Sequence, residues 1–422
     1  MTIYRRYLLY VPVLFCATGL LFVKSFVYAR IFSVEGFGLL NQALLFAGTF
    51  AIFASGGLHL LGHKLLPQFH ALGDKRSVAD LLGSAIAAFG ISTLVAGIAI
   101  SVAIFFRWVP SATTGYATLV FAVAQCLFML RLIDIKSELR FVEHALLSLT
   151  RAIALLALGV LVAALTHDVA ATLAVEGLVT LLLAAPMLRG ARGLSIIART
   201  ASIRTDQRWL ESNLPAAMRL LWLNGTVTLL YAIDRWVGVA MLSKRQYGIF
   251  ALGLLVILVF ETLQVIVSVA AYPLMGRMIA RGAHVRAFNL ATLATIIAMI
   301  ATASLYLPFV YLLDYVVRDY LPSYADAVTV VRIAVIAGAF RLADFYASYS
   351  ILCNHEQRLA QLFGLLVILV AATVMAIHFI GGVVFDPDRL VLVTLGTSVA
   401  GFLLNLTVAV WARQRQRLVT SA

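Results

Sequence analysis

The sequence has little charge for its length. Only 12% of its 422 residues are Asp, Glu, Lys or Arg, which is about half the share found in soluble domains. Hydrophobic residues make up 63% of the chain, and its mean hydropathy is +1.00. The length alone would suggest two or three soluble domains, but this composition excludes them. The lipid bilayer is therefore the expected solvent of the whole chain.

Cysteine is also scarce, since the chain has only three. Cys16, Cys126 and Cys353 lie in or beside apolar segments, with neither the spacing of metal ligands nor a disulfide pattern. The sequence also lacks the phosphate-binding motif G-x-x-x-x-G-K-[ST] and any recognisable pair of nucleophile and base. We therefore expect neither an enzyme nor a cofactor. A transport step would draw its energy from an ion gradient or from the membrane potential.

Acidic residues are outnumbered by basic ones, 19 to 32, which gives a net charge of +13. The Lys and Arg residues are scattered among apolar segments, so we expect no nucleic-acid partner. With the N-terminus inside, basic residues in the predicted cytoplasmic segments outnumber those in the outer segments roughly threefold. This positive-inside bias predicts a multi-pass protein of the cytoplasmic membrane with both termini in the cytoplasm.

Apolar stretches long enough to cross a bilayer recur along the chain. A transmembrane helix needs about 20 mostly apolar residues. The pattern predicts about twelve such helices, near residues 7–29, 38–62, 78–106, 115–133, 144–166, 169–188, 214–241, 247–273, 286–312, 327–352, 358–382 and 389–411. The fold class that follows is an all-α polytopic membrane protein.

The two halves of the sequence repeat. Segment 33–38 (SVEGFG) follows the first predicted span, and segment 243–248 (SKRQYG) follows the seventh, 210 residues later. The pairs Arg131–Asp134 and Arg341–Asp344 stand at the same offset. Because each half has an even number of spans, we expect a parallel repeat with a pseudo-twofold axis along the membrane normal. The predicted parts are a six-helix bundle at 1–188, a basic cytoplasmic linker at 189–212, a second bundle at 213–412 and a basic cytoplasmic tail at 413–422.

Ionisable side chains inside the predicted spans are expensive, at about 2.5–3.5 kcal/mol near the bilayer centre, so each needs a reason. Cations outnumber acids among them, which indicates an anionic, phosphate-bearing substrate. In the seventh span, polar residues share one helix face and are expected to line a transport cavity. The substrate-binding candidates read from the residues are Lys24, Arg219, Asn224, Tyr231, Arg235 and Arg341.

Coupling to a proton or sodium gradient requires a carboxylate in the membrane, and the candidates are Asp234 and Glu261. Other readings remain open for several charges. Arg219 lies near a span end, where a long side chain can reach the interface. In Arg131–Asp134 and Arg341–Asp344 the two residues have i, i+3 spacing. The Arg and Asp of each pair could therefore neutralise each other and have a structural role in helix packing.

Residues 29–40, ARIFSVEGFGLL, follow the first span directly. They resemble the opening signature of Wzx-type polysaccharide flippases, in which an Arg and an acidic turn lead to an aromatic–Gly pair. These proteins belong to the multidrug/oligosaccharidyl-lipid/polysaccharide exporter superfamily. The resemblance implies a MATE-like fold and a flippase that moves an undecaprenyl-pyrophosphate-linked oligosaccharide across the bacterial inner membrane by alternating access. It also implies surface polysaccharide synthesis (capsule, exopolysaccharide or O-antigen), with a polysaccharide polymerase among the partners.

The resemblance places Lys24 and Arg30 where family members tend to carry basic residues near the pyrophosphate. Multidrug exporters of the same superfamily usually keep a coupling acid in the first helix, where this chain has Lys24 and no acid. A cation-coupled multidrug exporter remains the alternative. A membrane polysaccharide polymerase or ligase is an alternative of another class, although it would need a large outer loop that the predicted spans do not leave.

Overall fold

The computed structural model describes residues 3–105, 111–188, 207–353 and 355–421. Most of the predicted linker, at 189–206, lies outside the described residues. Helices account for nearly all of the described chain, in which no strand is present. The fold class predicted from the apolar stretches, an all-α polytopic membrane protein, is therefore confirmed.

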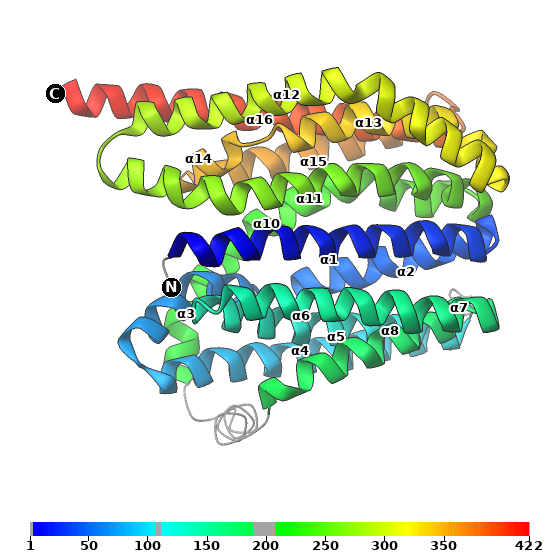
Figure 1. Ribbon diagram of the computed structural model, residues 1–422, viewed down its shortest axis with the longest axis horizontal. Coiled ribbons are helices and arrows are strands. Elements are labelled where there is room, and N and C mark those ends of the chain that lie inside the picture. The colour runs from blue at the N-terminus through cyan, green and yellow to red at the C-terminus, as the bar shows by residue number, and fades with distance from the viewer. Residues whose placement is uncertain (1–2, 106–110, 189–206, 354, 422) are drawn as a thin grey trace. The chain divides into compact units, whose positions relative to one another are not determined.

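Internal packing divides the chain into two units, in the order of the colours in Figure 1. The N-terminal unit comprises Met1–Phe32 and Leu39–Trp222, and the C-terminal unit comprises Ser33–Gly38 and Leu223–Ala422. The first helices in chain order are α1 (Ile3–Ile31), α2 (Val34–Phe53), α3 (Leu58–Leu72), α4 (Lys75–Phe105), α5 (Ala112–Ser137), α6 (Phe141–Ala154), the π-helix η1 (Leu155–Gly159), α7 (Val160–Thr166), α8 (Val169–Ala184) and η2 (Ala185–Leu188).

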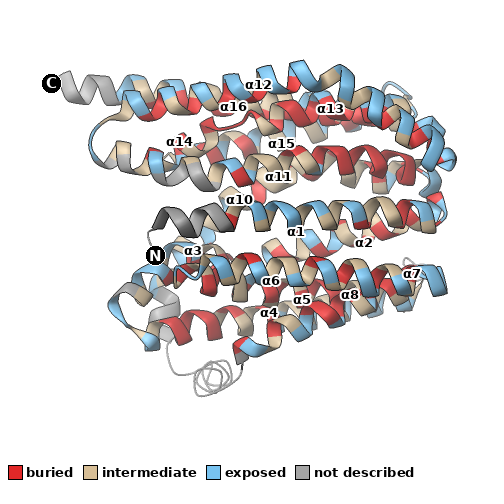
Figure 2. Ribbon diagram, viewed as in Figure 1, coloured by how far each residue is buried: buried red, intermediate tan, exposed pale blue. Residues whose placement is uncertain are grey.

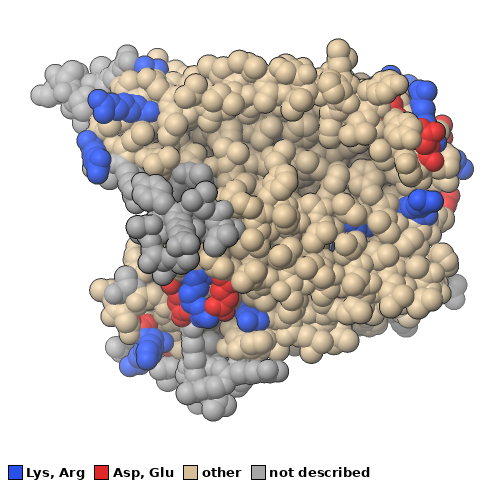
Figure 3. All heavy atoms as spheres, in the orientation of Figure 1, with Lys and Arg blue, Asp and Glu red and all other residues tan. Residues whose placement is uncertain are grey.

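The remaining helices are α10 (Gln207–Met241), α11 (Lys244–Ala280), α12 (His284–Tyr315), η3 (Val316–Tyr320), η4 (Pro322–Ala327), α13 (Val328–Leu342), α14 (Tyr346–Leu352), α15 (Glu356–Phe379) and α16 (Pro387–Ser421). Eleven helices of the described chain are long and apolar enough to cross a membrane, and they coincide with eleven of the predicted spans. On the face drawn in Figure 3, most charged side chains lie towards the two ends of the helices, and little charge shows between them. A bilayer favours this distribution.

Two predicted spans are broken. The second, at 38–62, is interrupted at Gly56 and Gly57, whose φ angles are +57° and +84°. A side chain at Gly57 would also collide with the backbone of Ala217, so α3 packs on α10 through this glycine. The tenth, at 327–352, is divided between the 15-residue α13 and the 7-residue α14. Sequence reasoning missed both breaks because apolar residues continue through them.

The internal repeat is visible in the local geometry. In the first copy the amide of Gly36 donates to Ser33 Oγ over 3.1 Å, and in the second the amide of Gln246 donates to Ser243 Oγ over 3.3 Å. These residues are again 210 apart. Helix α5 packs on α8 in the N-terminal unit, and the helix that corresponds to α5, α13, packs on α16 in the C-terminal unit.

Two glycines of the repeat lie against each other within the C-terminal unit. A Cβ atom on Gly38 would lie 2.5 Å from the carbonyl oxygen of Lys244 and 3.0 Å from the amide nitrogen of Gly248. A Cβ atom on Gly248 would in turn collide with Val34. The starts of α2 and α11 therefore cross at backbone contact, which only glycine permits.

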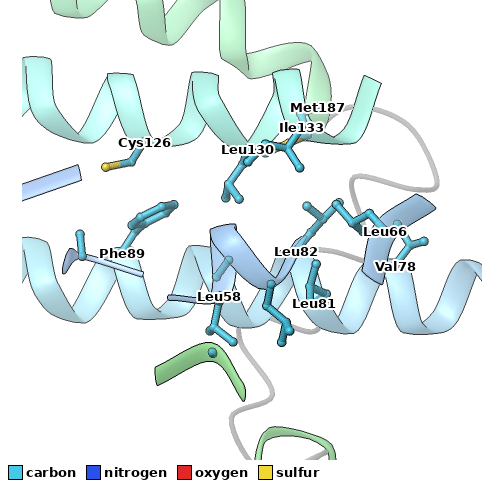
Figure 4. Close-up of a cluster of buried hydrophobic side chains, with 14 of the residues drawn as sticks. Leu58, Leu66, Val78, Leu81, Leu82, Phe89, Cys126, Leu130, Ile133 and Met187 are labelled. Atoms are coloured by element: carbon cyan, nitrogen blue, oxygen red, sulfur yellow. The ribbon is translucent and has the colours of Figure 1, made fainter. Parts of the chain in front are cut away.

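Each unit has its own apolar core. In the N-terminal unit, α3, α4 and α5 enclose the cluster drawn in Figure 4, which includes Leu66, Leu81, Leu82 and Leu130. In the C-terminal unit, buried residues concentrate along α11 and α13 (Figure 2). Polar side chains inside these bundles are therefore surrounded by apolar packing, and they need partners of their own.

Candidate functional site

A buried ion pair lies inside the N-terminal unit. Lys24 on α1 binds Glu176 on α8, with Nζ 2.5 Å from Oε1, and their side chains are 10% and 1% exposed. The Tyr28 hydroxyl donates to the same carboxylate oxygen over 2.5 Å. Lys24, a predicted pyrophosphate ligand, is thus already neutralised by a carboxylate that lies 152 residues along the chain.

The π-helix η1 packs against the Lys24–Glu176 ion pair through Gly159. A Cβ atom on Gly159 would collide with the Tyr28 hydroxyl and would lie 3.2 Å from Glu176 Oε1. Glycine is therefore required where the π-turn brings the backbone against the carboxylate, and such π-turns are frequent at functional sites. One turn of α8 further on, Arg151 donates to Thr180 Oγ1 over 3.2 Å, and its guanidinium lies 4.9 Å from the Phe128 ring centroid.

The Lys24–Glu176 pair has a direct consequence for mutation. Changing Lys24 to Ala leaves the Glu176 carboxylate buried without its cation, which typically costs about 3–5 kcal/mol. We expect Lys24→Ala to lower the amount of protein in the membrane and its melting temperature in detergent. The double variant Lys24→Met, Glu176→Gln should recover part of that loss, because it leaves no carboxylate unpaired, while the buried Arg151 loses the Coulombic attraction of Glu176. Full stability of Lys24→Ala, with no gain in the double variant, would contradict this assignment.

In the C-terminal unit, Arg341 on α13 forms an ion pair with Glu261 on α11. Arg341 Nε also donates to Ser398 Oγ over 3.0 Å, and the guanidinium lies 4.6 Å from the centroid of the Tyr231 ring. The i, i+3 reading of Arg341 with Asp344 is therefore wrong, because the carboxylate partner of Arg341 comes from another helix. Glu261, a predicted coupling acid, is held by this arginine.

The corresponding reading of Arg131 with Asp134 is also wrong. Arg131 donates to the carbonyl oxygen of Leu183, and Asp134 accepts from His70 Nε2 at 3.1 Å. His70 Nδ1 lies 3.8 Å from Glu138 Oε1. The ligand atoms of His70, Asp134 and Glu138 all lie within 4.8 Å of one another, so this trio is the group in the described chain with the spacing of a metal site.

Asp344 lies at the break between α13 and α14, and its side chain is buried. Its Oδ2 accepts from Asn405 Nδ2 at 2.6 Å and faces the Tyr231 hydroxyl at 3.5 Å, whereas its Oδ1 has no hydrogen-bond partner. The structure records no ion pair between Asp344 and a basic side chain of the described residues. A buried carboxylate at an interrupted membrane helix is a typical place for a coupling ion.

The break itself is supported by side chains of two other helices. Thr295 on α12 donates to the carbonyl oxygen of Ala343 over 2.8 Å. Gln264 on α11 donates to the carbonyl oxygen of Asp344 over 3.1 Å. These bonds satisfy backbone groups that the broken helix leaves open, which the interior of a membrane protein requires.

The two units carry a polar pair at equivalent positions. Asp234, a predicted coupling acid, stands 210 residues after Lys24 and accepts a hydrogen bond from Thr394. Thr394 and Glu176 occupy corresponding positions on their helices. Thr394 follows Asp386, at the start of α16, by the same number of residues as Glu176 follows Asp168, at the start of α8. The N-terminal unit thus has the ion pair Lys24–Glu176 at these two positions. The C-terminal unit has the hydrogen-bonded pair Asp234–Thr394 there.

The other predicted residues lie as follows. Tyr231 faces the interior of its own bundle, where an added side chain at Gly401 would touch its ring. Asn224 is half-buried, and Arg30 and Arg219 are exposed. Arg235 is half-buried, with its Nε buried and without a hydrogen-bond partner. The structure pairs none of these three arginines with a carboxylate of the described residues.

Sequence reasoning missed the polar faces of two helices. On α8, Thr172, Glu176 and Thr180 are almost fully buried and repeat every four residues, on one helix face. On α16, Thr394, Ser398 and Asn405 are buried, and their i, i+4, i+11 spacing also defines one face. The same periodicity test that selected α10 would have found both.

The described chain is thus a multi-pass array of apolar helices with buried charges, one of them at a broken helix. No family model matches the chain, and no curated protein matches it in sequence. Its fold is shared with solved transporters. An inward-facing multidrug resistance MATE family transporter of the MOP superfamily has a TM-score of 0.62 and 14% identity, over 95% of each chain.

The outward-facing conformation of such a transporter matches with a TM-score of 0.61 and 12% identity, over 99% of this chain and 96% of the other. The eukaryotic MATE transporter AtDTX14 matches with a TM-score of 0.58 and 11% identity, over 98% of both chains. The predicted MATE-like fold is therefore confirmed. At these identities the likeness concerns the fold.

Proposed function

We propose that the chain is a flippase that moves an undecaprenyl-pyrophosphate-linked oligosaccharide across the bacterial inner membrane by alternating access, for surface polysaccharide synthesis. Polysaccharide polymerase would then act on its product. The observation that carries the proposal is the charge left over inside the bundles. Each acid that we located at membrane depth has a partner for at least one oxygen, whereas the Nε of Arg235 is buried without a hydrogen-bond partner.

The half-buried guanidinium of Arg235, whose Nε has no hydrogen-bond partner, favours an anionic substrate. Guanidinium groups stay charged in proteins and present a fork of donors that fits phosphate oxygens. Burying such a group without a partner is costly, so a substrate that supplies the phosphate would compensate for it.

The alternative is a cation-coupled multidrug exporter, which the fold of the structural neighbours supports. Both functions require a coupling group, and the geometry favours Asp344 over Asp234 and Glu261. Asp344 has a free buried oxygen, while Glu261 is bound by Arg341 and Asp234 by Thr394. The two functions differ in what they expect of the first span, because multidrug exporters usually carry a coupling acid there. Here the first span carries Lys24, and the acid beside it, Glu176 on α8, is paired with that lysine.

A deletion strain distinguishes these functions. For the flippase we expect lipid-linked oligosaccharide to accumulate on the cytoplasmic side and surface polysaccharide to disappear, with drug susceptibility unchanged. Thin-layer or mass-spectrometric analysis of extracted lipids measures the first effect, and growth in a panel of cationic drugs measures the last. Increased drug susceptibility with normal polysaccharide would identify the exporter instead.

A further inference from the structure

One end of the C-terminal unit carries two arginines around a tryptophan, which we term the Arg–Trp cluster: Arg358 on α15, with Trp411 and Arg415 on α16. The guanidinium of Arg358 lies 3.8 Å from the centroid of the Trp411 ring, and that of Arg415 lies 5.4 Å from it. His355, just before α15, lies edge-on to the same ring with centroids 4.9 Å apart. Two helices thus bring two cations to one aromatic surface.

The two arginines of the cluster are both exposed, and the structure pairs neither with a carboxylate whose side chain it describes. Stacking on Trp411 holds the guanidinium planes in place but leaves their N–H donors free for another acceptor. An ordered, exposed pair of cations is suited to bind an anion.

The start of α15 adds to this positive field. Helix α15 runs for 24 residues, from Glu356 to Phe379. The first amides of such a helix point outward and carry the positive end of the helix dipole, which favours phosphate. Arg358 lies in this first turn, so the helix terminus and its guanidinium face the same region.

The position of the cluster along the helices identifies the source of the phosphate. The apolar run of α15 follows Arg358, and that of α16 ends at Ala412, just before Arg413 and Arg415. Both arginines therefore lie at the boundary of the hydrocarbon region, at the depth of lipid headgroups. Tryptophan is enriched at this depth for the same reason. A phosphate bound here would be attached to a lipid more readily than supplied from solution.

We propose that the Arg–Trp cluster is a binding site for the headgroup phosphate of an anionic membrane phospholipid. Arg358 and Arg415 donate to the phosphate oxygens, the first turn of α15 contributes amide donors, and Trp411 packs against the glycerol and upper acyl chain. Basic sites between membrane helices bind anionic headgroups in this way. The site does not depend on what the protein transports.

Lipid binding by the purified full-length protein tests the proposal. Native mass spectrometry gives the affinities for phosphatidylglycerol and for phosphatidylcholine. We expect the double variant Arg358→Gln, Arg415→Gln to bind phosphatidylglycerol on the order of tenfold more weakly than the parent, with phosphatidylcholine binding unchanged. Trp411→Ala, which keeps both charges, should weaken phosphatidylglycerol binding by a smaller factor.

The matched control is Arg281→Gln, Arg286→Gln, which removes the same charge from exposed positions beside the start of α12. We expect the control to retain phosphatidylglycerol binding. Equal losses in both double variants would reduce the effect to net charge and overturn the site. Displacement of the lipid by millimolar inorganic phosphate would show that free phosphate is the ligand and would overturn the lipid assignment.

Discussion

Replacing Arg235 with Ala is expected to lower transport of lipid-linked oligosaccharide at least about tenfold while leaving the amount of protein in the membrane unchanged. A charge-assisted hydrogen bond contributes about 1.5–3 kcal/mol, which corresponds to a tenfold to hundredfold loss. Stability should fall little, because the Nε of Arg235 has no hydrogen-bond partner and the Coulombic attraction to Glu261 that is lost leaves that carboxylate still bound to Arg341. Export of surface polysaccharide in a complemented deletion strain, with immunoblotting of membranes, measures both quantities.

Two further variants sharpen the Arg235 experiment. Arg235→Lys keeps the charge but loses the planar fork, so we expect partial activity. Arg245→Ala removes an exposed arginine a short distance along the chain, at the start of α11, and should transport normally. Normal export by Arg235→Ala would remove the argument for an anionic substrate. A matching loss in Arg245→Ala would mean that net charge, rather than Arg235, is required.

Replacing Asp344 with Asn is expected to abolish transport driven by an ion gradient. The side chain keeps nearly the same shape and can still bond to Asn405, but it can no longer bind and release a proton or a sodium ion as a carboxylate does. Transport in vesicles with an imposed proton or sodium gradient measures the effect. Downhill movement of substrate without a gradient should be reduced much less.

The helix break needs its own control, because Asp344 also belongs to the junction of α13 and α14. Gln264→Leu removes the bond to the carbonyl oxygen of Asp344 and leaves the carboxylate in place. We expect this variant to remain coupled. Gradient-driven transport at the parent rate by Asp344→Asn would move the coupling role to another acid, and Asp234→Asn and Glu261→Gln in the same assay would show which one.

The apolar stretches were sufficient to predict where helices lie. Eleven predicted spans overlap helices long enough to cross a membrane, although the second of these helices already ends at Phe53. The match follows because a bilayer requires each crossing to be an apolar helix of sufficient length. The offset of 210 residues likewise predicted two equivalent turns, at Ser33 and Ser243. An internal repeat can be recognised from the sequence alone, because it is a comparison of two segments and requires no knowledge of which residues are in contact.

The partners of the charged residues could not be predicted in this way. Lys24 was expected to meet a substrate and instead meets Glu176. Arg341 was a substrate-binding candidate that could also have paired with Asp344, and it binds Glu261, 80 residues away in the sequence. Spacing along one helix describes neighbours on that helix, whereas a buried ion pair is decided by which other helix packs against it.

The sequence by itself determined that this protein is a repeated array of membrane helices with a surplus of positive charge, because composition and periodicity reflect the solvent around each helix. Only the tertiary structure decided which of those charges are already paired. It also showed that Asp344 lies at a helix break held open by Thr295 and Gln264. Those properties depend on contacts between distant segments, which form only when the bundles pack.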